Sequence, residues 1–234
     1  MPWVFVRCLV TAGLLLMVAA CGRISTASPP SPAKNLAGQC ASSVGSDGYG
    51  IVDVTQDLSI ANDSGEITVN CTIHLHNTAK LTIANSQLKT RNLIVSDDMP
   101  DAQGSNFKIT GSTLTGVGTV ALVVDLRHHP DTIAVRQSTI DYGLGVWMSA
   151  GGMGSGNNAG GGTVDVTDST VRSTDSSSRG IRIVASTGGG VGNFVNDTFQ
   201  TPSSNGLAIL YAGSCHEERV TGAPGACSSA RGSS

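Results

Sequence analysis

Two pairs of adjacent polar residues could carry out acid–base chemistry on a sugar polymer. The carboxylates are Asp97 and Asp98, and two imidazoles follow at His128 and His129. Cleavage of a glycosidic bond needs two carboxyl groups that flank the bond, one as acid and one as base or nucleophile. The alternative interpretation is that Asp97 and Asp98 have a structural role, because Asp is also common in turns. The catalytic residues, if there are any, are therefore unknown from the sequence.

Basic side chains could instead support a lyase, which removes a proton beside a uronate carboxylate. Such enzymes use Lys or Arg as the base, often with a calcium ion bound by acidic residues. The available residues do not converge in the sequence, so solvated surface charges are the better interpretation, and we expect no cofactor. The candidate bases are Lys108, Arg136, Arg172 and Arg182, and the candidate calcium ligands are Asp141, Asp165 and Asp168.

Trp147, Arg182 and His74 form a third candidate group, a binding surface. Strand alternation points all three outward, and Trp147 and Arg182 could stack as a cation–π pair. An outward Trp on a flat sheet suits stacking against a sugar ring. The alternative is that the Gly-rich segment 149–162 folds back and buries Trp147. His74 and His76 could bind a metal, but with no third ligand nearby we expect two solvated histidines and no metal site.

A sequence motif that recurs five times determines where these candidate residues lie in the fold. It has the form apolar-x-apolar-x-x-Ser-x-apolar, with Asp197 in place of Ser in the last copy. The Ser or Asp positions are 26, 26, 31 and 28 residues apart, which is typical of stacked repeat units. The copies are LTIANSQL at 81–88, FKITGSTL at 107–114, IAVRQSTI at 133–140, VDVTDSTV at 164–171 and GNFVNDTF at 192–199.

Each repeat predicts about three short strands and almost no helix. In the first copy, Leu81 and Ile83 point inward with Thr82 opposite, and Ser86 and Leu88 return to the inner side after a bend. No long apolar period of 3.6 residues is present, and Val, Ile and Thr are abundant, which favours strands. Strands this short bury a core only if successive repeats stack as a solenoid.

Stacking predicts ladders of like side chains about 4.8 Å apart. Two ladders are apolar and inward, one is polar and inward, and one is outward. In the polar ladder, the Ser hydroxyls can bond one another or the backbone of the bend. The predicted ladders are Ile83–Ile109–Val135–Val166–Phe194, Leu88–Leu114–Ile140–Val171–Phe199, Ser86–Ser112–Ser138–Ser169 and Thr113–Thr139–Thr170–Thr198.

The repeat resembles the right-handed parallel β-helix of the pectin-lyase-like superfamily, whose coils carry similar ladders of small polar and aliphatic residues. This resemblance implies an all-β, single-stranded solenoid of about five to six coils over residues 67–211. A β-sandwich is the alternative, but it would not need the same motif in every unit. Because the superfamily includes lyases, hydrolases, adhesins and inert scaffolds, the fold does not define an activity.

Asp97-Asp98, His128-His129 and Gly180-Ile181-Arg182-Ile183 resemble, in that order, the paired Asp, the His and the basic sugar-binding segment of polygalacturonase-like glycosidases. The chain departs from their pattern at three points. No Asn-Thr-Asp triplet precedes Asp97, no Gly flanks the two histidines, and Val184 stands where a Lys is expected. A non-catalytic protein is therefore predicted, with an enzyme as the alternative.

Residues 1–20 predict an export signal. Arg7 precedes an apolar run that is too short to favour a permanent membrane span. The small residues directly before Cys21 resemble a bacterial lipoprotein cleavage site, which implies acylation of Cys21 and anchoring in a membrane. An ordinary secretory signal with an incidental Cys is the alternative. Residues 21–38 are rich in Ser, Pro and Ala, which predicts a flexible tether.

Four further cysteines predict disulfide bonds, because their number is even in an exported chain. Three pairings are possible. Cys40–Cys71 and Cys215–Cys227 are favoured, because these pairs flank opposite ends of the repeat array, where open strand edges need protection. We therefore expect an N-terminal cap at 39–66 and a C-terminal cap and tail at 212–234.

Charge and length limit the possible functions. Removing Arg7 with the signal leaves 13 of the 14 Lys and Arg residues against 17 Asp and Glu. No basic cluster is present, so nucleic acid is not expected as a partner. The prediction is an exported β-helix protein, anchored to the bacterial cell membrane or envelope through Cys21, with a binding or structural role. Polysaccharide is the favoured ligand, and a polysaccharide-cleaving lyase or glycoside hydrolase is the alternative.

Overall fold

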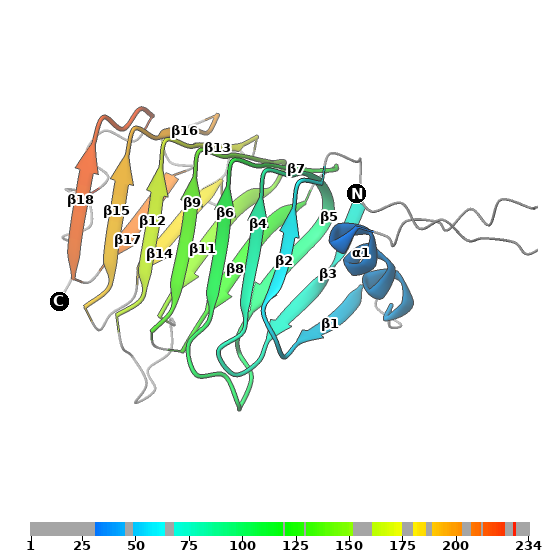
Figure 1. The fold of residues 1–234 in the computed structure, drawn as a ribbon. Coiled ribbons are helices and arrows are strands. Elements are labelled where there is room, and N and C mark those ends of the chain that lie inside the picture. Colours follow the sequence, from blue (N-terminus) through cyan, green and yellow to red (C-terminus); the bar gives the residue numbers. More distant parts are fainter. Residues whose placement is uncertain are drawn as a thin grey trace, which may run out of the picture.

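The strands of this protein wind into a parallel β-solenoid of about five turns, as a computed structural model shows (Figure 1). The predicted all-β solenoid is confirmed. The structure describes residues 31–44, 49–63, 68–118, 120–128, 130–151, 161–174, 180–185, 189–202, 207–211, 213–222 and 227.

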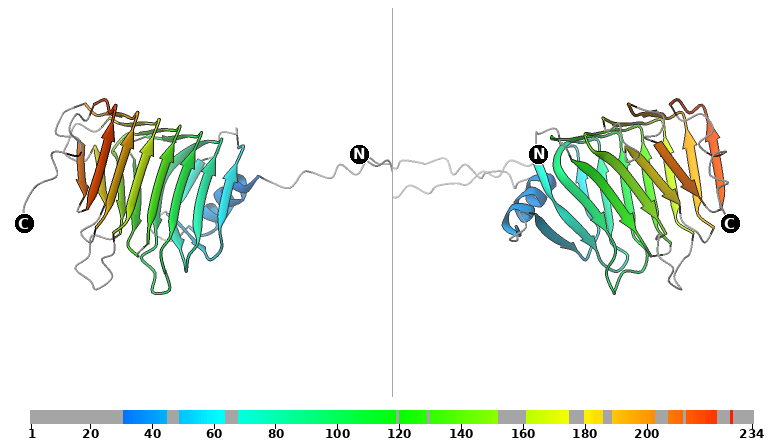
Figure 2. Two further views of the ribbon diagram at one scale, coloured as in Figure 1. Left: turned by 60° about the vertical axis from the view of Figure 1, so that its left-hand side comes forward. Right: turned by 180° about the vertical axis from the view of Figure 1, so that it is seen from behind.

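Within these residues the strands form two parallel sheets, which Figure 2 shows from two further sides. Sheet A has 11 strands: β1 Gly50–Val54, β3 Thr68–Leu75, β5 Gln87–Ser96, β7 Thr113–Gly116, β8 Ala121–Leu126, β10 Thr139–Tyr142, β11 Gly145–Ala150, β13 Thr170–Ser173, β14 Ile181–Ala185, β16 Thr198–Gln200 and β17 Leu207–Tyr211. Sheet B has seven: β2 Leu58–Ala61, β4 Lys80–Ala84, β6 Asn106–Thr110, β9 Thr132–Arg136, β12 Thr163–Thr167, β15 Val191–Val195 and β18 Ser214–Glu218.

Three strands per coil occur from β6 onward, in the order of one sheet B strand, one short strand and one longer strand of sheet A. The preceding coil differs, because its second and third strands are joined in β5. The first half of β5 pairs with β7 and the second half pairs with β8. The long strand therefore joins the short-strand side and the long-strand side of later coils into the single sheet A.

The predicted apolar ladders are present in register. Ile83 pairs with Ile109, and the same file continues through Val135 to Val166 and Phe194. The second apolar ladder and the outward Thr ladder follow the predicted register as well. All side chains of the two apolar ladders are at most 2% exposed, so stacked coils supply the core that single coils lack.

The polar ladder fastens each bend to the next coil. Ser86 N–H donates to Ser112 Oγ at 3.1 Å, Ser112 N–H donates to Ser138 Oγ at 3.1 Å, and the file ends where Ser169 N–H donates to Asp197 Oδ1 at 3.0 Å. Each Ser hydroxyl donates in turn to the carbonyl two residues before it. The predicted hydroxyl–backbone bonding is therefore confirmed.

A left-handed residue makes each of these bends. It directly precedes the polar ladder position, or the equivalent Asp63 and Val220 in the first and last bends, with φ between 48° and 56°, and Asn, Asp and Gly adopt this conformation most readily. At Gly111 a Cβ atom would also lie 2.6 Å from Asn85 Oδ1 of the adjacent coil, so the close approach of the two bends favours glycine. The left-handed residues are Asn62, Asn85, Gly111, Gln137, Asp168, Asn196 and Arg219.

Helix α1 (Pro32–Ser42) covers the N-terminal end of the solenoid (Figure 1). Ser31 caps it by accepting the Lys34 N–H, and Pro32 fits the first turn, where its missing N–H is not needed. Its buried residues include Leu36 and Cys40, and Cys40 forms a disulfide with Cys71 of β3 at a Cα–Cα distance of 5.3 Å.

The helix was not predicted, because the Ser, Pro and Ala content of residues 21–38 favoured a flexible tether throughout. Residues 32–38 are helical instead, and their burial against the first coil stabilises a sequence with little helical pattern of its own. No helix in the described part of the chain is long and apolar enough to cross a bilayer.

The C-terminal end closes with β18, which pairs with β15 and so extends the solenoid past the predicted range. In β18 the inward position that follows Phe194 is taken by Glu217, which accepts the N–H of Cys227 at 3.1 Å. Cys227 is disulfide-bonded to Cys215 at a Cα–Cα distance of 5.5 Å. Both favoured cysteine pairs are therefore present, one at each end. Glu217, a charged residue at an inward position of the first apolar ladder, therefore ends the stacking of coils.

Candidate functional site

The outer face of sheet A carries a row of side chains in register along the solenoid axis. Trp147 lies between the buried Val146 and Met148 in β11, so it points outward, where it is partly exposed. Arg182 of β14 pairs with Trp147 and is exposed. We name this the Trp147 row; it consists of Ile51, Thr72, Ile94, Val123, Trp147 and Arg182.

The Trp147 row is mainly apolar and has a cation at Arg182, beyond which the register continues to Ala208 of β17. Neighbouring strands are about 4.8 Å apart, so the indole and the guanidinium side chains start close enough to contact one ligand together. Flat apolar surface beside a hydrogen-bond donor is what a sugar ring needs for stacking and orientation. The predicted fold-back of 149–162 over Trp147 concerns mainly residues 152–160, which lie outside the described residues.

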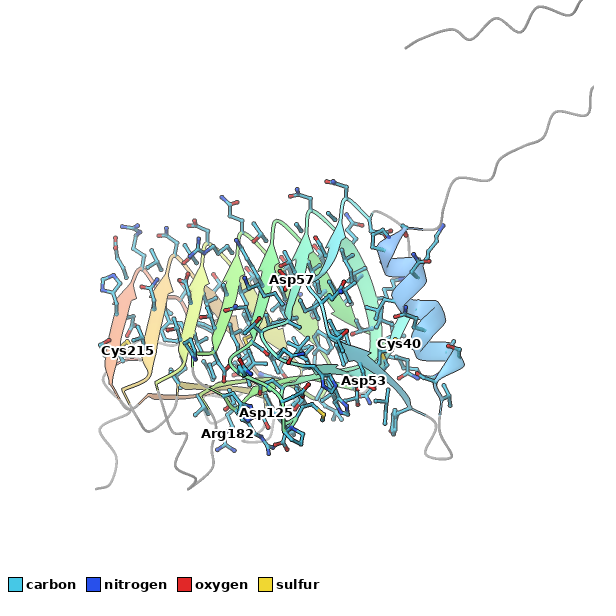
Figure 3. The ribbon with its side chains drawn as sticks, turned by 60° about the horizontal axis from the view of Figure 1, so that its bottom comes forward. Cys40, Asp53, Asp57, Asp125, Arg182 and Cys215 are labelled. Carbon is cyan, nitrogen blue, oxygen red and sulfur yellow. A yellow bond between two sulfur atoms is a disulfide. The ribbon has the colours of Figure 1, made fainter. Side chains whose placement is uncertain are left out.

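His74 lies in a second, parallel row on the same face rather than in the Trp147 row. Two residues along a strand separate the rows, which is about 7 Å. His74 pairs with Asp53 on one side and Ser96 on the other, and Asp125 follows in β8. Figure 3 shows Asp53, Asp125 and Arg182 along one side of the molecule, with Asp57 elsewhere. The three predicted ligand-binding residues therefore share a face, with His74 displaced from the other two.

His76 joins two carboxylates into what we name the His76 cluster: Asp53, His74, His76 and Asp101. His76 Nδ1 lies 2.8 Å from Asp101 Oδ1, and its Nε2 lies 3.2 Å from Asp53 Oδ1. The hydrogen bond to Asp53 raises the pKa of His76, with a smaller contribution from Asp101, and the same bond lowers the pKa of Asp53. His74 Nδ1 lies 3.4 Å from Asp53 Oδ1.

The sequence did not indicate this cluster, because Asp53 and Asp101 are each more than 20 residues from His76. The signal that could have found Asp53 is register, since it is the β1 partner of His74. Asp101 lies in the bend after β5 and follows no repeat position. Among the described residues, no group of three or more His, Cys, Asp or Glu side chains is arranged to hold a metal ion.

A second charged group, named the Arg127 cluster, contains Asp98, Asp125 and Arg127. The Arg127 guanidinium lies 2.6 Å from Asp98 Oδ2 through Nη1 and 2.7 Å from Asp125 Oδ2 through Nη2. The hydrogen bond to Asp125 is the main cause of a raised pKa for Arg127. One cation therefore serves two carboxylates. Asp98, a predicted candidate acid, is engaged in this pairing at the surface.

Asp97, the other candidate acid, is fully buried and supports the backbone. Its carboxylate accepts the Arg127 N–H at 2.5 Å and faces the His128 N–H at 3.4 Å. Beside it, burial raises the pKa of Asp131 to about 8, although a hydrogen bond from the Ser105 N–H opposes that rise. Asp131 is 1% exposed. Both carboxyl groups are thus buried in the bend and inaccessible from the surface.

The candidate enzyme constellation is divided between these places. Asp97 and His128 meet at the bend, with a distance of 3.6 Å from Oδ2 to Nδ1, while Arg182 lies in β14. Three strand spacings separate β5 from β14, which is about 14 Å. His129 and the acylation candidate Cys21 lie outside the described residues.

The lyase candidates occupy still other positions. Arg136 lies 2.5 Å from Asp165 on sheet B, and Arg172 lies 3.3 Å from Asp141 between β13 and β10. Burial alone would raise the pKa of Asp165, but hydrogen bonds, above all the one from Arg136, outweigh that effect and lower it. These pairs tie neighbouring coils together and do not converge on one point.

Comparison with known proteins gives no relative: no family model, curated protein or solved structure matches the chain.

Proposed function

We propose that this chain is a lipid-anchored protein of the bacterial cell envelope or surface, whose solenoid binds polysaccharide without cleaving it. The observation that carries the proposal is the Trp147 row, which combines apolar surface, an indole and an exposed guanidinium on one flat face. An extended polymer can follow such a face along the solenoid axis and repeat its contacts from coil to coil.

The anchor part of the proposal rests on the sequence. Val18, Ala19 and Ala20 precede Cys21 after an apolar core, in the arrangement of a lipoprotein signal. Two or more acyl chains on Cys21 would give stable membrane attachment. Mass spectrometry of the purified chain tests this directly, because the proposal expects an acylated N-terminal Cys21 and no residues 1–20. A mature chain that starts elsewhere or carries no lipid contradicts the anchor.

The fold part goes one step further than the parallel solenoid described above. We infer that the solenoid is a right-handed parallel β-helix similar to those of the pectin-lyase-like superfamily. The Ser and aliphatic ladders support this, and parallel connections within one sheet are right-handed in nearly all proteins.

The binding part is tested on a glycan array with the full chain purified in detergent. We expect Trp147→Ala to weaken binding by about 30-fold or more, the loss of a central aromatic contact. Arg182→Ala should weaken it by a smaller factor. Arg172→Ala is the matched control, because Arg172 is an exposed arginine of the same coil that lies on β13, away from the row. Equal binding by all three variants contradicts the proposed surface.

A product-release assay with the same polymers separates the binder from the enzyme. The accessible candidate acid, Asp98, is paired with Arg127, and the buried acids at the bend have no open path to a polymer. We therefore expect no new reducing ends and no unsaturated ends. Release of either, if it is lost in the double variant Asp97→Ala/Asp98→Ala, would replace the binder with a polysaccharide-cleaving enzyme.

A further inference from the structure

The charges beside the Trp147 row are unbalanced toward the negative. In the Arg127 cluster two carboxylates share one guanidinium. In the His76 cluster Asp53 and Asp101 contact His76, and His74 lies 3.4 Å from Asp53, so the cluster stays negative unless both imidazoles are protonated. Both clusters flank the first four strands of the row, β1, β3, β5 and β8. An exposed surface of this composition attracts cations and repels anions.

Three of the four carboxylates in these clusters are largely exposed, and the fourth, Asp125, is 25% exposed. The side chains of Asp53, Asp98 and Asp101 are 63%, 56% and 48% exposed. Asp125 is the register neighbour of Ser96 and lies two residues beyond Val123 of the row. A sugar ring packed on Val123 could therefore place a substituent over Asp125, since the two positions are about 7 Å apart along the strand.

A polyuronate would meet these same carboxylates at short range. At physiological ionic strength charges interact over about 8 Å, so the clusters would act on any polymer that follows the row. Arg182 is the one formal cation of the row itself and lies at its far end. The charge pattern is complementary to a polymer that carries ammonium groups and is unfavourable for one that carries a carboxylate on every sugar.

We propose that the outer face of sheet A selects a polysaccharide with free amino groups. Its rings pack on the Trp147 row, and its ammonium groups pair with the carboxylates of the His76 and Arg127 clusters. This inference rests on the proposed polysaccharide-binding function and specifies its ligand class.

The test compares three probes of equal length on the full chain by titration calorimetry: glucosamine oligomers, N-acetylglucosamine oligomers and galacturonate oligomers. The first two share one backbone and differ at C2, which carries an ammonium group in one and a neutral acetamide in the other, and the salt dependence of binding separates the charge from the added acetyl group. We expect the glucosamine oligomer to bind about tenfold or more tightly than its acetylated counterpart, as one charge-assisted hydrogen bond would give, and the galacturonate oligomer to bind weakest. Raising the salt concentration to roughly 1 M should remove most of this preference.

Single variants locate the charges responsible. We expect Asp53→Asn and Asp125→Asn each to weaken glucosamine binding about two- to fivefold, the range for exposed ion pairs. Both substitutions keep the side-chain shape and an acceptor oxygen, and they act on different coils. Asp57→Asn is the matched control, because Asp57 is an exposed Asp that precedes the first strand of sheet B. Thermal unfolding checks that each variant is folded.

The possible outcomes distinguish amino-sugar selection from the proposed polysaccharide binding on which it rests. Binding that requires Trp147 but is equal for acetylated and free amines, or stronger for galacturonate, keeps the polysaccharide binder and overturns the amino-sugar selection. The amino-sugar selection is also overturned if neither Asp variant differs from the Asp57 control. No binding of any of these probes, together with a blank glycan array, overturns both proposals.

Discussion

Replacing Ser138 with Ala tests whether the polar ladder keeps successive bends in register. Ser138 Oγ accepts the Ser112 N–H at 3.1 Å and donates to the Arg136 carbonyl at 2.7 Å. The carbonyl remains satisfied in the variant, because it also accepts the Gly111 N–H at 3.0 Å. The Ser112 N–H loses its acceptor in a residue that is 4% exposed.

The magnitude follows from that single orphaned donor. A buried N–H left without a partner costs about 1–3 kcal/mol, and this cost dominates because Ala removes only the hydroxyl and leaves a small void. We expect the free energy of unfolding to fall by this amount. Urea unfolding followed by circular dichroism measures it, with the slope of the transition as a check that the unfolded state is unchanged. The outward variant Thr139→Ser is the control, with an expected change below about 0.5 kcal/mol.

A loss below about 0.5 kcal/mol for Ser138→Ala would refute the reasoning. It would mean that the Ser112 N–H finds another partner, such as water, and that the apolar ladders alone set the register. A second substitution at Ser112 extends the test. It orphans a different donor, the Ser86 N–H, and because the two serines are adjacent in one hydrogen-bond network, the double variant measures the coupling between the bends.

Three further predictions concern the ends and the core. Burial raises the pKa of Asp197 from an ordinary value of 3.8 to about 7, so the folded chain retains a proton that the unfolded chain releases. Stability should therefore fall as pH rises from about 4 to 7, and Asp197→Asn should flatten that slope in urea midpoints. Replacing both Cys40 and Cys71 with Ala opens a loop of 31 residues, for which the chain-entropy model gives a loss of about 3–4 kcal/mol in the same assay. An unchanged midpoint would show that the bond does not restrain the unfolded chain. Tyr142→Phe removes a buried hydroxyl that lies 2.5 Å from Thr90 Oγ1. Calorimetric unfolding should show that the free energy of unfolding falls by about 1–3 kcal/mol, because the Thr90 hydroxyl loses its partner. Adding Thr90→Val to this variant should restore part of the loss.

Repetition explains why so much of the fold could be predicted. Each copy of the motif fixes which of its side chains face inward, and stacking then forces like residues such as Ile83 and Ile109 into one file. The long strands β3 and β5, which pair with each other along both halves of β5, could not be predicted, because they lack the bend that separates two strands in the later coils. Helix α1 was missed for a related reason. Its formation depends on the apolar surface that the first coil presents, and residues 32–38 alone contain no such information.

In the candidate site, the residues on strands could be predicted and the residues in bends could not. Trp147, Arg182 and His74 were placed on one face by alternation and register, which are properties of the strands. Asp101 and Arg127 were not anticipated as partners, because they lie in bends whose paths vary from coil to coil. Periodic positions of a solenoid are thus open to prediction, whereas charge pairing between bends requires the three-dimensional path of the chain.

The bond between Cys40 and Cys71 also has a mechanical consequence. A pulling force applied to the N-terminal side of the chain would first unfold α1 as far as Cys40. From there the force would pass through the disulfide bond to Cys71 in β3. Residues 41–70, which include β1 and β2, would therefore carry no tension. A pulling force on the N-terminal side of the chain would therefore load the solenoid at β3, which is paired with β1 on one side and β5 on the other.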